Sequence, residues 1–340
     1  MPPSNAKREL GRGEKVIPGL WRLRLPLPWP GVPHCNAWAI KSGDGIVLVD
    51  CGLHQLPDGD QPGSLNQLEH ALAQVGLRLE QVKQLVITHA HTDHWGEAAT
   101  VIERSGCEFW IHPNHQHGSE AEANPDAAFT HRIAIARAGG VPEHVLARYS
   151  ERIRDLPSGI AAAVEPLPDH LLHDGVTIDT DLGAWQVYET PGHAPSHVCL
   201  FQPERRVLIS GDHVLGRISL HFDYGWTPDP IAEFMNSLEI VDRLDARLAV
   251  SGHGKPFTDV RAHIIGTRQL TAERLRKTLG ALDSLPRTAL ELVPTVFDEQ
   301  LTPESAYWRL LEMLCYLQHL ELQGSVVRES DGVIERFRRA

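Results

Sequence analysis

The sequence lacks the features that would hold the chain in a membrane or tie it together with disulfides. Its five cysteines form no Cys-x-x-Cys pair, and their odd number excludes a complete disulfide framework. No apolar run approaches the roughly 18 residues that a membrane span needs. The first 15 residues have no apolar centre of the kind found in a signal peptide. We therefore expect a soluble protein of the reducing cytoplasm that does not bind membranes.

Positive charge is also scarce. The chain has 32 lysines and arginines against 44 aspartates and glutamates, a formal net charge of −12. A surface of this sign argues against general affinity for nucleic acid, although it does not exclude a local basic groove. The 340 residues are 42% hydrophobic, which allows packed cores in two domains or in one domain with an appendage. A small-molecule substrate is therefore favoured, and nucleic acid is the less favoured partner.

Against this background, one stretch concentrates ligand-type side chains: Thr-His-Ala-His-Thr-Asp-His at residues 88 to 94. It follows an apolar run at 82 to 87 that predicts a buried strand, and it precedes a predicted helix at 95 to 103. Because strand side chains alternate, His89 and His91 point to the same side, while Asp93 and His94 can diverge towards a second point. Imidazole and carboxylate are ligands that zinc, iron and manganese accept. The stretch predicts two metal ions close together.

Other predicted strands end in a glycine beside a histidine or an aspartate, at His193, Asp212 and His253. Such turns let a side chain project from the strand end into a site. Asp50 also ends an apolar strand, and a buried carboxylate needs a partner, so we expect it to bond a metal-bound histidine. His197 either orients a ligand, contacts the substrate or is simply a packed histidine.

Two further segments bear on the substrate. A helical insertion at about 119 to 165 is expected to cap the site and select substrates. The loop from residue 221 to 226 offers aromatic surface for an acyl group, and its candidate substrate-binding residues are His221, Tyr224 and Trp226. The cluster of His112, His115 and His117 lacks a matching carboxylate, so we expect it to be solvated or to lie at the rim of a pocket.

Taken together and in this order, the motifs closely resemble those of the metallo-β-lactamase superfamily over residues 16 to 265. The resemblance implies an α+β fold, an αββα sandwich of two mixed sheets with helices outside, and a dinuclear metal site at one edge. It further implies that Asp50 supports the site and that Asp212 bridges the metals. The implied ligands are His89, His91 and His193 for the first metal and Asp93, His94 and His253 for the second.

Departures from the family pattern narrow the function. The flavodiiron oxygen reductases carry a glutamate where His91 stands, and true β-lactamases are also disfavoured. The full set of nitrogen and carboxylate ligands resembles the hydrolytic branches, which include glyoxalase II, the lactonases and RNA-processing enzymes.

The ends of the chain differ from this central part. Residues 1 to 15 are expected to be disordered. Residues 266 to 340 predict three helices and a hairpin, which resemble the winged helix of the lactamase-β-like-2 endoribonucleases. Acidic and basic residues nearly balance there, so electrostatics does not support strong nucleic-acid binding. The predicted helix at 303 to 323 is apolar on more than one stripe, which suggests a homodimer surface formed by Leu310, Leu311, Leu314, Leu317 and Leu320.

The resulting hypothesis is a metal-dependent hydrolase that cleaves an ester, thioester or lactone of a small molecule. A hydroxide that bridges two divalent metals attacks the carbonyl, and Asp93 and Asp212 orient it or accept its proton. Zinc is favoured, with iron or manganese as alternatives. A metal-dependent endoribonuclease is the main alternative function. An iron dioxygenase acting on persulfides and a non-catalytic DNA-binding regulator are further alternatives.

Overall fold

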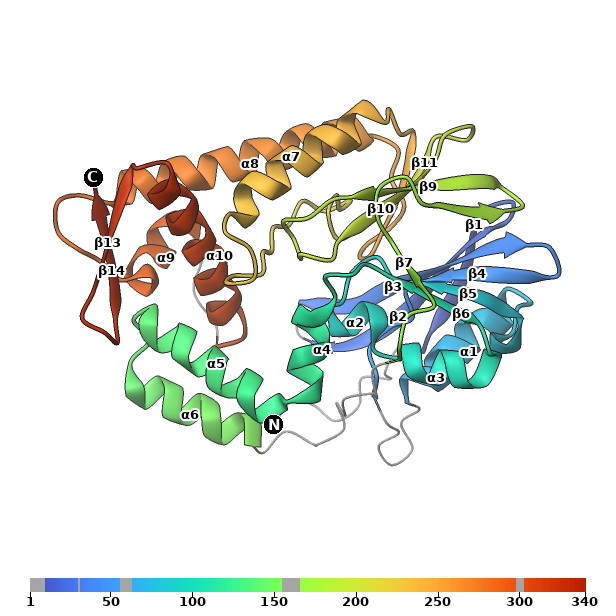
Figure 1. Ribbon diagram of the computed structural model, residues 1–340, viewed down its shortest axis with the longest axis horizontal. Helices are drawn as coiled ribbons and strands as arrows, with labels where there is room; N and C mark the ends of the chain where they lie inside the picture. The colour runs from blue at the N-terminus through green and yellow to red at the C-terminus, as the bar shows by residue number, and fades with distance from the viewer. Residues whose placement is uncertain (1–9, 30, 56–62, 155–165, 298–302) are drawn as a thin grey trace.

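The computed structural model describes residues 10–29, 31–55, 63–154, 166–297 and 303–340. Two β-sheets pack face to face, and helices cover the outer face of each (Figure 1). A seven-stranded sheet runs in the order β1 to β7, and a five-stranded sheet in the order β12-β11-β10-β9-β8. Within the described residues, no helix has the length and apolar content needed to cross a membrane.

The first sheet shows how the sequence builds a layer that is buried on both sides. In β4, Ile46 and Leu48 pack under the outer helices, whereas Val47 and Val49 face the second sheet. This alternation is what a strand covered on both faces requires. Helices α1 (Ser64–Gln74) and α3 (Ala98–Ser105) cover the outer face, and the short helix η1 (Leu79–Gln81) precedes β5. The strands are β1 (Arg12–Ile17), β2 (Leu20–Trp29), β3 (Val32–Ser42), β4 (Gly45–Val49), β5 (Val82–Val86), β6 (Glu108–Ile111) and β7 (His170–Leu171).

The second sheet repeats the pattern on the other side. In β10, Val198 and Leu200 face the first sheet, and Cys199 and Phe201 pack under α7 (Pro230–Arg243) and α8 (Val260–Ala281). The four layers confirm the expected α+β sandwich of two sheets between helices. The strands are β8 (Thr177–Thr180), β9 (Gly183–Glu189), β10 (Val198–Gln202), β11 (Val207–Gly211) and β12 (Leu248–Ser251).

The topology brings several strand ends to one edge of the sandwich. β4 and β5 are parallel neighbours in the first sheet, and β11 and β12 are parallel neighbours in the second. β9 has the same direction as β11, because both are antiparallel to β10. Parallel strands end on the same side, so the residues that follow them meet there. The short helix α2 (Thr92–Trp95) begins at this edge.

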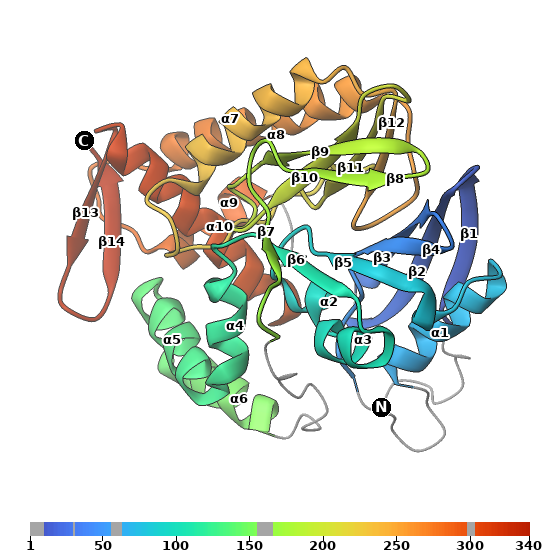
Figure 2. The ribbon, with the colours of Figure 1, turned by 45° about the vertical axis from the view of Figure 1, so that its right-hand side comes forward.

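The helical insertion packs against the C-terminal segment rather than against the sandwich alone (Figure 2). The backbone N–H of Leu290 donates to the carbonyl of Gly139 at 3.0 Å, and Leu310 lies against Gly139. The insertion comprises α4 (Gln116–Ala123), α5 (Pro125–Ala138) and α6 (Glu143–Arg154), and the part expected at 155–165 lies outside the described residues. The C-terminal elements are α8, α9 (Ala289–Phe297), α10 (Pro303–Leu322), β13 (Val326–Ser330) and β14 (Glu335–Arg339).

The C-terminal elements appear in the expected order of three helices and a hairpin, and their assignment as a winged helix stays a prediction. α8 runs without a break across residue 266, where we expected a domain boundary. The leucines expected to form a dimer surface are instead buried inside the chain, because helices of the insertion and of the C-terminal segment cover α10. A homodimer, if formed, uses another surface. The corrected residues are Leu310, Leu311, Leu314, Leu317 and Leu320.

The N-terminus corrects a second expectation. Residues 1–9 lie outside the described part of the chain, but residues 12 to 15, which we expected to be disordered, belong to β1 and pair with β2. Gly11 and Gly13 allow the backbone to approach α1 closely. A Cβ atom on Gly11 would overlap the carbonyl oxygen of Gln67, and the Gly11 N–H donates to the Gln67 side chain at 2.6 Å.

This close approach predicts that Gly11→Ala destabilises the protein by about 1–3 kcal/mol, because the added methyl group pushes β1 away from α1. Gly280→Ala is the matched control, since a Cβ at Gly280 meets nothing within 4 Å. That change in α8 should be neutral or stabilising by up to ~1 kcal/mol. Urea unfolding of both variants measures the difference. Equal stability of the two would show that β1 tolerates displacement.

Candidate metal centre

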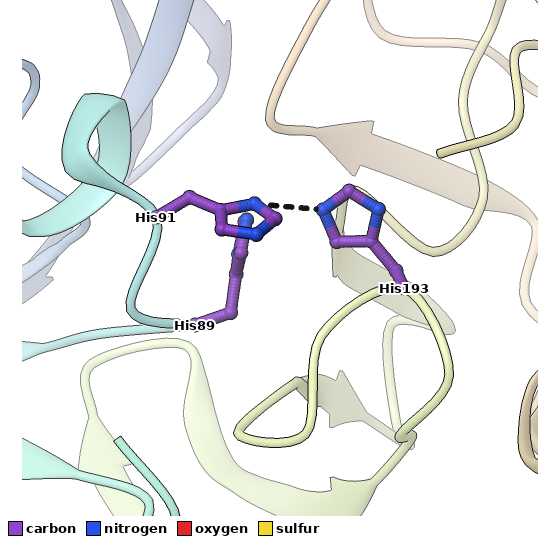
Figure 3. A group of neighbouring side chains, drawn as sticks. All are labelled: His89, His91 and His193. Atoms are coloured by element: carbon purple, nitrogen blue, oxygen red, sulfur yellow. Dashed lines mark hydrogen bonds between the residues drawn. The ribbon is translucent and has the colours of Figure 1, made fainter. Parts of the chain in front are cut away.

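The first group of ligand-type atoms comes from His89, His91 and His193, whose nearest nitrogens all lie within 4.8 Å of one another. His89 and His91 lie on the segment between β5 and α2, and His193 lies on the loop after β9 (Figure 3). Nε2 of His193 is 3.1 Å from Nδ1 of His91. Burial, together with His91 nearby, lowers the pKa of His193 to about 3, so its ring is neutral and has a lone pair available.

Hydrogen bonds fix which nitrogen of each ring faces this group. Nδ1 of His193 donates to the carbonyl of His221 at 3.0 Å, which leaves Nε2 for a ligand. Nε2 of His91 donates to Oδ2 of Asp223 at 2.9 Å, which leaves Nδ1. Burial disfavours a charged His91, but the Asp223 carboxylate outweighs it and raises the pKa of His91. Nδ1 of His91 and Nε2 of His193 therefore face each other within the first group.

The second group consists of Asp93, His94 and His253, whose ligand atoms also lie within 4.8 Å of one another. Nδ1 of His253 donates to the carbonyl of His34 at 2.9 Å, so its Nε2 turns inward and lies 3.4 Å from Oδ2 of Asp93. Burial would raise the pKa of Asp93, but His94 and His253 beside it lower the pKa to about 2. Asp93 is therefore a carboxylate at neutral pH.

Asp212 lies between the two groups. Its Oδ2 is 3.1 Å from Nε2 of His253 and 3.9 Å from Nε2 of His193, and its Oδ1 is 3.6 Å from Nε2 of His94. Burial opposes ionisation, yet His253 and His94 hold the pKa of Asp212 well below its usual value. A carboxylate in this position reaches both groups of ligand atoms at once.

Asp50 lies behind the histidines and bonds His94. It follows β4 with a positive φ of 61°, an uncommon conformation for a residue other than glycine. Its carboxylate accepts three hydrogen bonds, from Nδ1 of His94 at 2.9 Å and from the backbone N–H and hydroxyl of Thr88 at 2.8 and 2.9 Å. The Thr88 hydroxyl in turn accepts from Nδ1 of His89 at 3.0 Å. One buried carboxylate thus fixes both rings with Nε2 facing the centre.

His197 is a buried histidine that accepts a hydrogen bond from the backbone of Asp212. Its Nε2 accepts the backbone N–H of Asp212 at 3.0 Å, and its Nδ1 donates to the hydroxyl of Thr190 at 2.8 Å. Burial keeps the pKa of His197 well below its usual value, so Nε2 remains an acceptor. A Cβ on Gly211 would lie 2.5 Å from this nitrogen, which explains the glycine before Asp212.

Whether metal ions fit the centre can be judged from its unsatisfied atoms. Nε2 of His89, Nε2 of His94 and Oδ1 of Asp212 are buried and have no hydrogen-bond partner among the residues that the structure describes. Leaving such groups unpaired costs free energy, which a bound cation removes. Histidine and carboxylate donors in this number suit zinc, iron or manganese. The donor set therefore fits divalent metal ions.

Comparison with known proteins agrees with this geometry. Residues 30–253, about two thirds of the chain, match the profile of the metallo-beta-lactamase superfamily. The chain belongs to the metallo-beta-lactamase superfamily. Residues 275–340 match the metallo-beta-lactamase-like C-terminal domain. Superfamily members use divalent metals, which is consistent with the clustered histidines and aspartates.

Relatives extend the similarity over nearly the whole chain. A probable metallo-hydrolase of Bacillus subtilis, YqjP, is 27% identical, and the alignment covers 91% of this chain and 94% of YqjP. The structure of the metallo-beta-lactamase family protein TTHA1429 from Thermus thermophilus superposes with a TM-score of 0.78 at 27% identity, covering 96% and 100% of the two chains. The human acyl-coenzyme A thioesterase MBLAC2 is 26% identical over 66% of this chain and 74% of its own length. The chain is a metallo-hydrolase of the superfamily.

Asp223 is the residue of this metallo-hydrolase that sequence reasoning missed. The His112, His115 and His117 cluster is buried, which excludes the solvated alternative, and its expected place at the rim of a pocket stays a prediction. Carboxylates that we did not anticipate face two of its members. Nε2 of His117 lies 3.7 Å from Oδ2 of Asp223, and Nε2 of His112 bonds Glu189 at 2.8 Å. One sequence signal could have found Asp223. It is an acidic residue two positions after His221, in a loop that follows a strand ending in a candidate ligand.

The candidate substrate residues separate into two environments. His221 lies beside the centre, with its ring centroid 5.7 Å from that of His91. Trp226 is 44% exposed, and its ring centroid is 6.0 Å from that of His117. Tyr224 faces the C-terminal segment instead, where its hydroxyl accepts from Nη1 of Arg328 at 3.5 Å. The structure therefore brings His221 and Trp226, but not Tyr224, to the neighbourhood of the centre.

The two groups of donors predict that the protein binds two divalent metal ions per chain. His94→Ala should lower the content towards one ion, because it removes a donor from the second group and leaves the first intact. Elemental analysis of protein prepared without chelator measures both values. His131→Ala, an exposed position in α5, is the control. One ion or none in the wild type after reconstitution would contradict the arrangement.

The bond from His91 to Asp223 predicts that Asp223→Asn weakens metal binding to the first group by roughly 10- to 100-fold, because no carboxylate then bonds Nε2 of His91 and fixes the ring with Nδ1 towards the centre. Competition with a chelator measures the affinity. Asp259→Asn, an exposed change whose side chain makes no cap hydrogen bond, should have no effect. Unchanged affinity in Asp223→Asn would show that packing alone orients His91.

Proposed function

We propose that the protein hydrolyses thioesters of small acyl groups with two divalent metal ions, zinc being favoured. The observation that carries the proposal is the convergence of buried, unpartnered donor atoms, His89 Nε2, His94 Nε2 and Asp212 Oδ1, at one edge of the sandwich. A relative named as an acyl-coenzyme A thioesterase supports the thioester within the wider class of esters, thioesters and lactones. The glyoxalase II-like and lactamase-β-like-2 branches stay predictions.

The proposed division of ligands follows the hydrogen bonds. His89, His91 and His193 would hold the first ion, Asp93, His94 and His253 would hold the second, and the Asp212 carboxylate lies within reach of both groups. Divalent ions at such a site lower the pKa of water to about 7 and polarise a carbonyl, as hydrolysis at neutral pH requires. The supporting bonds from Asp50, Asp223 and His197 keep the donors in place before the substrate arrives.

The carboxylates of Asp93 and Asp212 can orient the attacking water. Asp93 and Asp212 are ionised at neutral pH, so Oδ2 of Asp93 or Oδ1 of Asp212 can accept the hydrogen bond of that water and orient it towards the thioester carbonyl. Asp50 is already occupied by three donors and is buried behind His94, which excludes it from this role.

The charges of the C-terminal hairpin support a small-molecule substrate over RNA. Arg328 pairs with Glu321 and Glu335, Arg336 with Asp331, and Arg338 with Glu329. Arginines neutralised in this way offer little positive potential to a phosphate backbone. The endoribonuclease alternative therefore has no separate observation in its favour.

The test is a substrate panel with the metal-loaded protein: acetyl and benzoyl thioesters of N-acetylcysteamine, an aryl ester, a lactone and single-stranded RNA. We expect the thioesters to give the highest kcat/KM, and activity to disappear with chelator and return with metal. His89→Ala should lower kcat/KM by at least ~100-fold, because a ligand of the first ion is lost. His131→Ala is again the control.

Cleavage of RNA without cleavage of any thioester would refute the proposal and favour the endoribonuclease. Preference for the lactone would keep the metal centre but change the substrate class.

A further inference from the structure

Two exposed tryptophans, Trp226 and Trp308, each lie against a histidine that neighbours the metal centre. The ring centroid of Trp226 is 6.0 Å from that of His117, and the centroid of Trp308 is 6.5 Å from that of His221. The His117 and His221 rings are 5.9 and 5.7 Å from the ring of His91. Each tryptophan is thus one imidazole ring away from a candidate metal ligand.

Trp308 comes from the C-terminal segment, which sequence reasoning did not connect with the site. It lies in the first half of α10, and it is 41% exposed, whereas its neighbours Leu310 and Leu311 are buried. The adjacent Tyr307 is partly buried and packs against the core that the insertion and the C-terminal helices share, and this burial raises its pKa to about 12. Helix α10 therefore contacts both the insertion and the loop of residues 221 to 229.

Several contacts hold α10 in a fixed place relative to that loop. Nδ1 of His319 bonds both oxygens of Asp229 at 2.9 Å, and the Gln318 amide donates to the carbonyl of Pro228. The rings of Phe222 and Tyr316 pack with a centroid distance of 6.1 Å. Leu310 lies against Gly139 of the insertion. The two tryptophans are consequently mounted on elements that cannot move far apart without breaking these contacts.

Exposed tryptophans are costly to leave in water, and two of them bordering a reaction centre mark a binding surface. Indole rings gain additional stabilisation from pairing with another aromatic ring, by stacking or edge to face. Each tryptophan is separated from His91 by one imidazole ring, a span that a substrate bound at the first group of ligands can bridge.

We propose that Trp226 and Trp308 form an acyl-binding site for a flat aromatic acyl group, so that the C-terminal segment completes the active site of the enzyme. This proposal rests on the proposed thioester hydrolysis and adds the class of acyl group. His117 and His221 line the site between the tryptophans and the centre. Selectivity between substrates arises from this surface, while the metal ligands supply chemistry common to all of them.

The test compares the benzoyl and acetyl thioesters of N-acetylcysteamine in the full-length, metal-loaded protein. Trp308→Ala and Trp226→Ala should each lower the ratio of kcat/KM for benzoyl over acetyl by roughly five- to tenfold, because the acetyl group has no ring to pair with indole. Trp308→Phe should retain most of the ratio. Leu322→Ala, an exposed position at the far end of α10, should not change it.

Binding of S-benzyl-N-acetylcysteamine, a thioether that cannot be hydrolysed, provides a second readout by calorimetry. Its Kd should rise by roughly five- to tenfold in Trp308→Ala with metal content unchanged. An unchanged ratio together with an unchanged Kd in both alanine variants overturns the acyl site. If the wild type cleaves no thioester, the proposed function fails, and the thioether titration still decides whether the tryptophans bind an aromatic group.

Discussion

The buried carboxylate of Asp50 is the constraint on which the metal centre depends. It is 1% exposed, and it fixes His94 directly and His89 through the hydroxyl of Thr88. A buried charge is tolerated only when its oxygens are satisfied, and three donors from the segment after β5 do this here. The parallel pairing of β4 and β5 places donors and acceptor side by side. The fold of the first sheet therefore determines the directions of two ligand rings.

The second sheet also holds a ligand residue in place with a buried side chain, from the opposite side of the centre. His197 holds the backbone of Asp212, and the close approach of Gly211 to its ring leaves no room for a side chain. Donors from the two sheets come together only because the sandwich brings both sets of strand ends to one edge. Each sheet presents donors that are already oriented. Folding has therefore ordered these side chains before a cation binds, and binding loses less conformational entropy.

The sequence predicts those parts of the site that rest on local patterns. His89 to His94 form a contiguous motif after an apolar strand, and Asp212 and His253 follow glycines at strand ends, so both signals are short in sequence. Asp223 is 132 positions from His91, and only the folded structure reveals that they bond. The prediction of disorder at residues 12 to 15 was wrong for a related reason. The glycines there allow close contact with α1, which is distant in sequence.

The loop of residues 221 to 229 joins the metal centre to the C-terminal segment, so neither is independent of the other. At its first end, the carbonyl of His221 and the carboxylate of Asp223 orient two ligand rings. At its second end, Asp229 caps α7 and bonds His319 of α10. Any displacement of α10 therefore pulls on the residues that orient the ligands. In this chain, one loop thus contacts both the histidines of the first group and the C-terminal helix α10.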